Sequence, residues 1–136
     1  TGNMEKHLMI QANDNIEFLG FVDDKTLRNL YSECEALIFP QVEDFGITPL
    51  EAMASGRPVI ALEEGGALDT IIDGKTGIFF KKQTTIDLKG AIERYFHEKD
   101  KFDPQFIQQY AKGFDEAVFE KRLTTYLKEK WEKWQK

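Results

Sequence analysis

Short apolar runs that recur along the first eighty residues limit the fold more than any other feature of this sequence. Each run holds four residues, is rich in aliphatic or aromatic side chains, and is bounded by turn formers such as glycine and proline. Helical patterns lie between the runs. This alternation predicts an α/β fold, a Rossmann-like parallel sheet with flanking helices. The predicted strands are Ile16–Leu19, Ala36–Phe39, Val59–Leu62 and Gly77–Phe80.

Four helices are expected between and after these strands. The first follows Asp23 and Asp24, either of which can cap it. The others are expected from Pro49 to about Ser55, from Ala67 for a turn or two, and from about Ile86 to His97. The last of them has an apolar face that is predicted to be buried and consists of Ile86, Ala91, Ile92, Tyr95 and Phe96.

The sequence changes character near residue 100, where two helical patterns follow each other with no strand between them. Asp103 can cap the first, with Pro104 at its first position, and Asp115 can cap the second. We therefore expect two regions, a sheet-containing region at 1–99 and C-terminal helices at 100–136 that pack on it. The final helix carries an apolar stripe made of Phe119, Leu123, Tyr126, Leu127, Trp131 and Trp134.

Charge and cysteine content exclude several classes of protein. The 24 acidic side chains outnumber the 18 basic ones, and the net charge of −6 repels nucleic acid, so no nucleic-acid partner is expected. Cys34 is the only cysteine and cannot form an internal disulfide. No apolar run approaches the roughly 20 residues that cross a bilayer, and no signal peptide is recognisable. These features predict a cytoplasmic location.

The segment Gln41–Gly56 (QVEDFGITPLEAMASG) places two glutamates around a glycine. It follows the second predicted strand and enters a helix, which is where α/β proteins bind ligands. Gly46 lets backbone approach a ligand closely, and the unpaired N–H groups of the next helix favour phosphate oxygens. A second interpretation is a capping box, in which Thr48 is the N-cap and Glu51 reaches back. That interpretation leaves the preceding VEDFG unexplained.

Glu43 and Glu51 are the two ends of an E-x7-E pattern inside EDFGITPLEAMASGRPVIA. Together with NIEFLGFVDDKTLRNLYSECEALIFP and EEGGALDTIIDGKTGIFF, this stretch resembles the family 4 retaining glycosyltransferases. Within that family it is most similar to mannosyltransferases of bacterial and archaeal surface-polysaccharide synthesis. The resemblance implies a GT-B fold, which has two Rossmann-like domains with a cleft between them. Residues 1–99 would be part of the C-terminal, donor-binding domain, and residues 100–136 would reach toward the N-terminal domain.

The resemblance also implies roles for individual residues. Glu43 would be the catalytic residue, beside the transferred sugar, where it stabilises positive charge at the anomeric carbon. Glu51 would accept hydrogen bonds from the two ribose hydroxyls. Gly65 and Gly66 would keep a second backbone loop near the sugar. The residues implied to bind the nucleotide-sugar donor, from the base to the sugar, are Val22, Asp24, Asp44, Phe45, Gly46, Ile47, Thr48, Leu50 and Glu51.

The implied donor is GDP-mannose, and the implied acceptor is a saccharide or a lipid-linked molecule. The resemblance implies that no metal and no further cofactor are needed, with a helix N-terminus stabilising the leaving diphosphate. The sequence agrees in lacking a D-x-D triplet, a CxxC pair and an HExxH helix. Such an enzyme would work in the cytoplasm, including the cytoplasmic face of a membrane.

The resemblance also implies that the first two strands of this domain are absent from the sequence. The chain begins at TGNMEKHL, which resembles the segment after the domain's second strand. In the usual 3-2-1-4-5-6 order, the first strand separates the third from the fourth, here Ile16–Leu19 and Ala36–Phe39. Its absence would expose strand edges and apolar surface. We therefore expect an inactive fragment whose missing strands are supplied by another segment or by a second copy of the chain.

Two other functions remain open from the residues alone. The chain can belong to another GT-B nucleotide-sugar enzyme, such as an epimerase or phosphorylase relative. It can also be a non-catalytic nucleotide-binding or interaction module, in which the glutamates act as a helix cap and as surface charge.

Overall fold

One parallel sheet lies at the centre of the computed structural model, which describes residues 2–135. Its three strands follow the order β1-β2-β3, and the register places Ile60 between Ile38 and Ile78. Three of the four predicted strands and their parallel pairing are thereby confirmed. The bounds are Leu37–Phe39 for β1, Val59–Leu62 for β2 and Gly77–Phe80 for β3.

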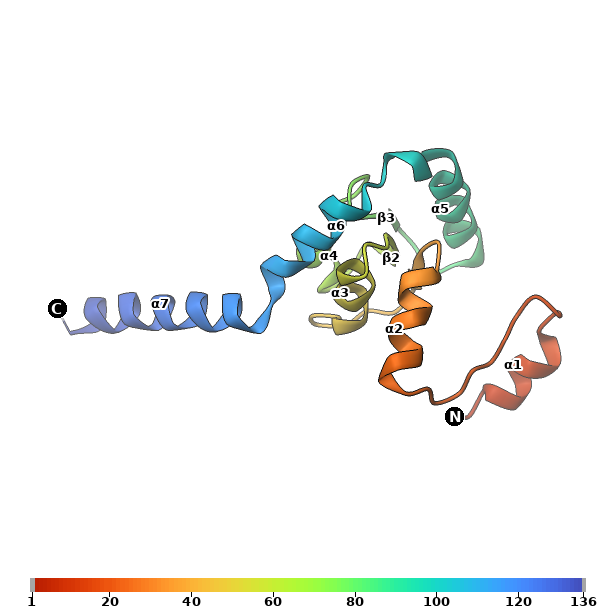
Figure 1. Cartoon of the computed structure of the whole chain (residues 1–136), viewed down its shortest axis with the longest axis horizontal. Helices are drawn as coiled ribbons and strands as arrows, with labels where there is room; N and C mark the ends of the chain where they lie inside the picture. The colour runs from red at the N-terminus through yellow and green to blue at the C-terminus, as the bar shows by residue number, and fades with distance from the viewer. Residues whose placement is uncertain (1, 136) are drawn as a thin grey trace.

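Helices connect the strands and cover them (Figure 1). α3 (Ile47–Ala54) joins β1 to β2 and packs on both, and α4 (Ala67–Thr70) joins β2 to β3. α5 (Thr85–Glu98) follows β3 and packs on β2 and β3. Met53 of α3 and Val59 of β2 are fully buried between these layers. The carboxyl ends of β1 and β2 therefore both open into loops that lead to helices.

The buried face of α5 is narrower than its sequence pattern predicts. Ala91 and Tyr95 are buried and Ile92 is partly buried, as expected. Ile86 is 82% exposed and Phe96 is 58% exposed, so the prediction was wrong for these two residues. The reason is that α5 packs on the sheet through β2 and β3, which cover a single stripe of the helix, and its further contact with the 3-10 turn η1 (Lys99–Lys101) lies at its C-terminal end.

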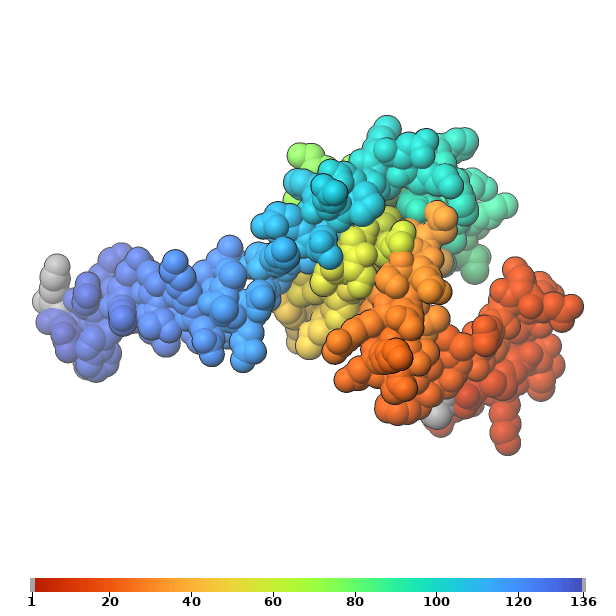
Figure 2. Space-filling view, viewed as in Figure 1, coloured from red at the N-terminus to blue at the C-terminus, as the bar shows by residue number. Residues whose placement is uncertain are grey.

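Of the two C-terminal helices, the first packs on the domain and the second extends away from it. α6 (Pro104–Ala111) packs on α3 through Ile107, which is fully buried, and Asp103 caps α6 by accepting a backbone hydrogen bond at 2.9 Å. A 3-10 turn, η2 (Lys112–Phe114), leads into α7 (Glu116–Trp134). α7 projects away from the domain, and all of its residues are at least partly exposed (Figures 1 and 2). This differs from the packing that we expected for the final helix.

At the N-terminal side, α1 (Glu5–Gln11) is followed by α2 (Asp24–Glu33), which packs against α3. The cap of α2 is Asp23, whose carboxylate accepts a hydrogen bond from the backbone N–H of Thr26 at 2.7 Å.

The stretch Ile16–Leu19 forms no strand, contrary to prediction. Its residues are exposed, and they pair with none of the strands in the described part of the chain. A strand needs a hydrogen-bonded neighbour, and within residues 2–135 no strand pairs with this stretch. β1 accordingly pairs with β2 on one side and, within residues 2–135, with no strand on the other, and Ile38 is 46% exposed.

Candidate functional site

Two loops meet at the carboxyl end of the sheet. One follows β1 and carries Glu43, and the other follows β2 and carries Gly65 and Gly66. The N–H of Gly66 donates to the backbone oxygen of Glu43 at 2.7 Å. A Cβ added at Gly65 would lie 2.6 Å from that same oxygen, and one added at Gly66 would lie 2.4 Å from the backbone oxygen of Asp44. Both glycines are therefore required for the close approach of the two loops.

The helix that leaves the first loop begins earlier than predicted. Gly46, with φ of 78°, is the N-cap of α3, and no side chain among residues 2–135 caps the helix. Thr48 and Pro49 lie inside the first turn. The capping-box interpretation is therefore wrong, because the positive φ that the loop requires places the helix start at Gly46, and Glu51 makes its hydrogen bond elsewhere.

The carboxylate of Glu51 faces α2. The hydroxyl of Tyr31 donates to Glu51 Oε2 at 3.0 Å. Burial raises the pKa of Tyr31 to about 12, with further contributions from the hydrogen bond to Glu51 and the charge of that carboxylate. Both residues line a groove of about 420 Å³ between α2 and α3, whose wall also includes Asp24 and Arg28. The structure thus brings Asp24 and Glu51 together, although they are distant in sequence.

Glu43 lies on the loop that precedes α3, outside this groove. Its side chain is exposed, and Gln41 Nε2 donates to its Oε1 at 3.1 Å. The same loop is held at Pro40, whose backbone oxygen accepts from Gln83 Nε2 at 2.8 Å. Asp44 is exposed beside Glu43.

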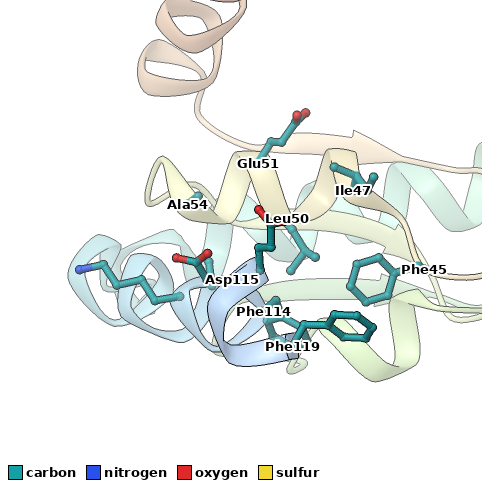
Figure 3. Close-up of a pocket in the computed structure, with 11 residues that line it drawn as sticks. Phe45, Ile47, Leu50, Glu51, Ala54, Phe114, Asp115 and Phe119 are labelled. Atoms are coloured by element: carbon teal, nitrogen blue, oxygen red, sulfur yellow. The ribbon is translucent and has the colours of Figure 1, made fainter. Parts of the chain in front are cut away.

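An apolar pocket of about 710 Å³ lies beside α3, next to η2 and the start of α7. Phe45, Ile47 and Leu50 line it together with Phe114 and Phe119. In Figure 3 the aromatic side chains lie on one side of α3, and the carboxylate of Glu51 points to the other side. The side chains of three predicted donor-binding residues therefore line an apolar wall, and their backbone groups remain at the start of the helix.

Some predicted donor-binding residues do not line the groove between α2 and α3, and two residues that contact the predicted glutamates were not predicted. Val22 precedes the cap of α2 and is not among the residues that line the groove. Tyr31 and Gln41 were not predicted. Tyr31 lies on the apolar face of its helix, which is typical of a core residue, and no local pattern reveals its bond to Glu51 twenty residues away.

The described residues contain no group of three or more His, Cys, Asp or Glu side chains that could hold a metal ion. Within the same residues, no helix combines the length and the apolar composition needed to cross a bilayer.

Comparisons with known proteins agree with the geometry. The family model described as "Glycosyl transferases group 1" matches residues 4–113. The chain is 38% identical over 86 residues to the alpha-1,3/1,6-mannosyltransferase ALG2 of Dictyostelium discoideum, a match that covers 62% of the chain and 20% of the relative. It is 33% identical over 121 residues to the human ALG2, covering 74% of the chain and 29% of the relative.

Solved structures show the same fold. Sucrose-phosphate synthase from Thermosynechococcus elongatus superposes with a TM-score of 0.79 at 27% identity, covering 92% of this chain and 33% of that one. Anabaena HepE in complex with UDP-glucose superposes with a TM-score of 0.74 at 25% identity, covering 92% and 36%. The chain thus spans about a fifth to a third of the length of these proteins, and its fold is that of part of a GT-B glycosyltransferase. The three-stranded parallel sheet, with two loops at its carboxyl end, agrees with the family match. Since that match extends over residues 4–113, the chain belongs to the group 1 glycosyl transferases.

Proposed function

We propose that this chain is the donor-binding part of a retaining glycosyltransferase that transfers mannose from GDP-mannose to a saccharide or lipid-linked acceptor. The observation that carries the proposal is the placement of Glu51. Its carboxylate is not used to cap α3 and instead lies in the groove with Asp24. An ionised carboxylate with two acceptor oxygens suits the adjacent hydroxyls of a ribose.

The start of α3 would bind the diphosphate. No side chain in the described part of the chain caps this helix, and its first turn contains no acidic residue, so its first N–H groups are available and the helix dipole favours an anion. Thr48 and Leu50 would donate through their backbone, whereas Pro49 has no N–H and contributes geometry. Phe45 and Gly46 would hold sugar hydroxyls through their backbone, next to the exposed Asp44.

Glu43 would act beside the anomeric carbon. As the bond from this carbon to the diphosphate breaks, positive charge develops on the sugar, and a carboxylate nearby stabilises it. The acceptor oxygen forms its new bond on the same face of the sugar, and the acceptor proton passes to the leaving phosphate. The hydrogen bond from Gln41 supports this role, because it restrains an otherwise exposed carboxylate. No step in this scheme needs a metal ion.

The identity of the donor rests on the relatives. The ALG2 proteins are named as mannosyltransferases, which supports mannose and with it GDP as the nucleotide. HepE was solved with UDP-glucose, which supports nucleotide-sugar binding in general. We further propose a role in polysaccharide synthesis on the cytoplasmic side of a membrane. Another segment or a second copy of the chain would complete the sheet at β1.

Calorimetric titration of the full-length polypeptide that carries this sequence tests the proposal. GDP-mannose, GDP and UDP-glucose are titrated into the wild type, Glu51→Ala and Glu43→Ala, with and without EDTA. We expect GDP to bind in EDTA and Glu51→Ala to weaken it by about tenfold, because a charge-assisted hydrogen bond contributes roughly 1.5–3 kcal/mol. Glu43→Ala would abolish transfer while GDP affinity is kept.

A matched control is Glu93→Ala, which removes an exposed glutamate of α5 that is 3.8 Å from Lys89 and far from the groove in sequence. It is expected to leave GDP affinity unchanged. If none of the three nucleotides binds to the wild type, the proposed function is wrong.

A further inference from the structure

The Glu51 carboxylate has one fixed partner. The Tyr31 hydroxyl donates to Oε2 at 3.0 Å, and no other side chain among residues 2–135 donates a hydrogen bond to this carboxylate. The bond joins two helices, since Tyr31 belongs to α2 and Glu51 to α3. It therefore fixes the orientation of the carboxylate relative to the groove that the two helices form.

Tyr31 is well suited to hold a partner in place. Its ring is partly buried and packs against the hydrophobic core, so the hydroxyl has little freedom. Glu51, in contrast, is exposed, and the last torsion of a glutamate is broad. Arg28 lines the same groove, so a carboxylate released from Tyr31 can turn toward that guanidinium instead.

The bond leaves the carboxylate able to accept more. A carboxylate has about four lone-pair sites, and Tyr31 occupies one of them on Oε2. Oε1 and the remaining site of Oε2 are enough for two adjacent hydroxyls. With its pKa at about 12, the phenol keeps its proton throughout the physiological range and remains a donor.

We propose that Tyr31 is a positioning residue of the donor site, whose hydroxyl aims the Glu51 carboxylate at the two ribose hydroxyls and so selects ribonucleotides over 2′-deoxyribonucleotides. This inference rests on the proposed function, in which Glu51 binds the ribose. In this arrangement Tyr31 acts on the donor through the Glu51 carboxylate, to which its hydroxyl donates. Its effect is on the number of hydrogen bonds that Glu51 can make at once.

The test compares nucleotides with and without the 2′-hydroxyl. GDP, UDP and their 2′-deoxy forms are titrated calorimetrically into the full-length polypeptide as wild type, Tyr31→Phe, Glu51→Ala and the double variant. Phenylalanine keeps the ring that packs on the core and removes only the hydroxyl. The wild type identifies which of the two bases is used in the remaining titrations.

We expect Tyr31→Phe to weaken the ribonucleotide by about three- to tenfold, the usual range for one hydrogen bond, and the 2′-deoxy form by less than about twofold. In the Glu51→Ala background the same change is expected to have no further effect, because the carboxylate that it positions is gone. A general structural role of Tyr31 would weaken both nucleotides equally.

A second tyrosine provides a matched control. Tyr95 donates to the backbone oxygen of Glu35 at 2.9 Å and to its Oε2 at 3.3 Å, at the amino end of β1. Tyr95→Phe removes a comparable bond away from the groove and is expected to leave the ratio of ribo- to deoxyribonucleotide affinity unchanged.

Three results would overturn the inference in different ways. If Glu51→Ala weakens binding and Tyr31→Phe does not, Tyr31 has no positioning role, and the proposed function stands. If Tyr31→Phe weakens both nucleotides equally, its role is structural. If the wild type binds neither GDP nor UDP, the proposed function fails, and the inference fails with it.

Discussion

Substitution of Gly66 by alanine tests whether the contact between the two loops holds the site together. Gly66 has φ of −62°, which alanine adopts without strain, so any effect must come from the added methyl group. That methyl carbon would lie 2.4 Å from the backbone oxygen of Asp44 and 2.6 Å from Phe45 Cα. Both are backbone atoms, and they cannot move aside as the end of a flexible side chain can.

The magnitude follows from the geometry. To reach an ordinary contact, the loop that carries Glu43 must move by about 1 Å, which would stretch its 2.7 Å hydrogen bond with Gly66 beyond bonding range. Overpacking costs about 1–3 kcal/mol, and the lost hydrogen bond adds about 0.5–1.5 kcal/mol. We therefore expect Gly66→Ala to lower the free energy of unfolding by about 2–4 kcal/mol.

Urea unfolding followed by far-UV circular dichroism measures this change, with Gly90→Ala as the control. Gly90 lies inside α5 and has no atom within 4 Å of an added Cβ, so alanine there is expected to stabilise by about 0.5–1 kcal/mol. Replacing glycine by alanine is thus expected to lower the free energy of unfolding at position 66 and to raise it at position 90. If Gly66→Ala destabilises by less than about 0.5 kcal/mol, the two loops do not touch as described and the reasoning is refuted.

Three further predictions concern the fold. Burial raises the pKa of Asp73, but this effect is outweighed by two hydrogen bonds from Arg94, each 2.9 Å, and one from the backbone N–H of Phe79. The pKa of Asp73 is therefore below its usual value. This stability is present above pH of about 4 and is lost as the pH falls through the lowered pKa, so urea midpoints of wild type and Asp73→Asn are expected to converge at low pH. Ile107→Ala should cost about 2–5 kcal/mol because Ile107 is fully buried, whereas Ile86→Ala, at an 82% exposed position, should change stability by less than about 0.5 kcal/mol in the same assay. Asp23→Ala removes the cap of α2 and should lower the unfolding free energy by about 0.5–2 kcal/mol, and an unchanged midpoint would exclude the capping role.

Local patterns predicted the parts of the fold that local chemistry determines. Val59–Leu62 and Gly77–Phe80 form strands with the predicted bounds, because each is an apolar run between turn formers and has a neighbour to pair with. Ile16–Leu19 is also mostly apolar and forms no strand, because pairing depends on a neighbour that composition does not reveal.

In the candidate site, too, local patterns predicted some features, and contacts between distant segments determined the others. The family resemblance identified the segment that carries Glu43 and Glu51, and the structure places it at the carboxyl end of β1. The capping-box interpretation was wrong although Thr48 and Glu51 have the required spacing, because a positive φ at Gly46 sets the start of the helix. The bond between Tyr31 and Glu51 joins two helices, so no local pattern could have predicted it.

The projection of α7 has a practical consequence for spectroscopy. Both tryptophans of the chain lie on this helix, with their rings 5.3 Å apart and with 58% and 78% of their surfaces exposed. Indole emission from Trp131 and Trp134 therefore reports the environment of α7 and is insensitive to the melting of the sheet. A blue shift of this emission would signal that the helix has become covered, which makes the native tryptophans a label-free probe for whatever contacts the end of the chain.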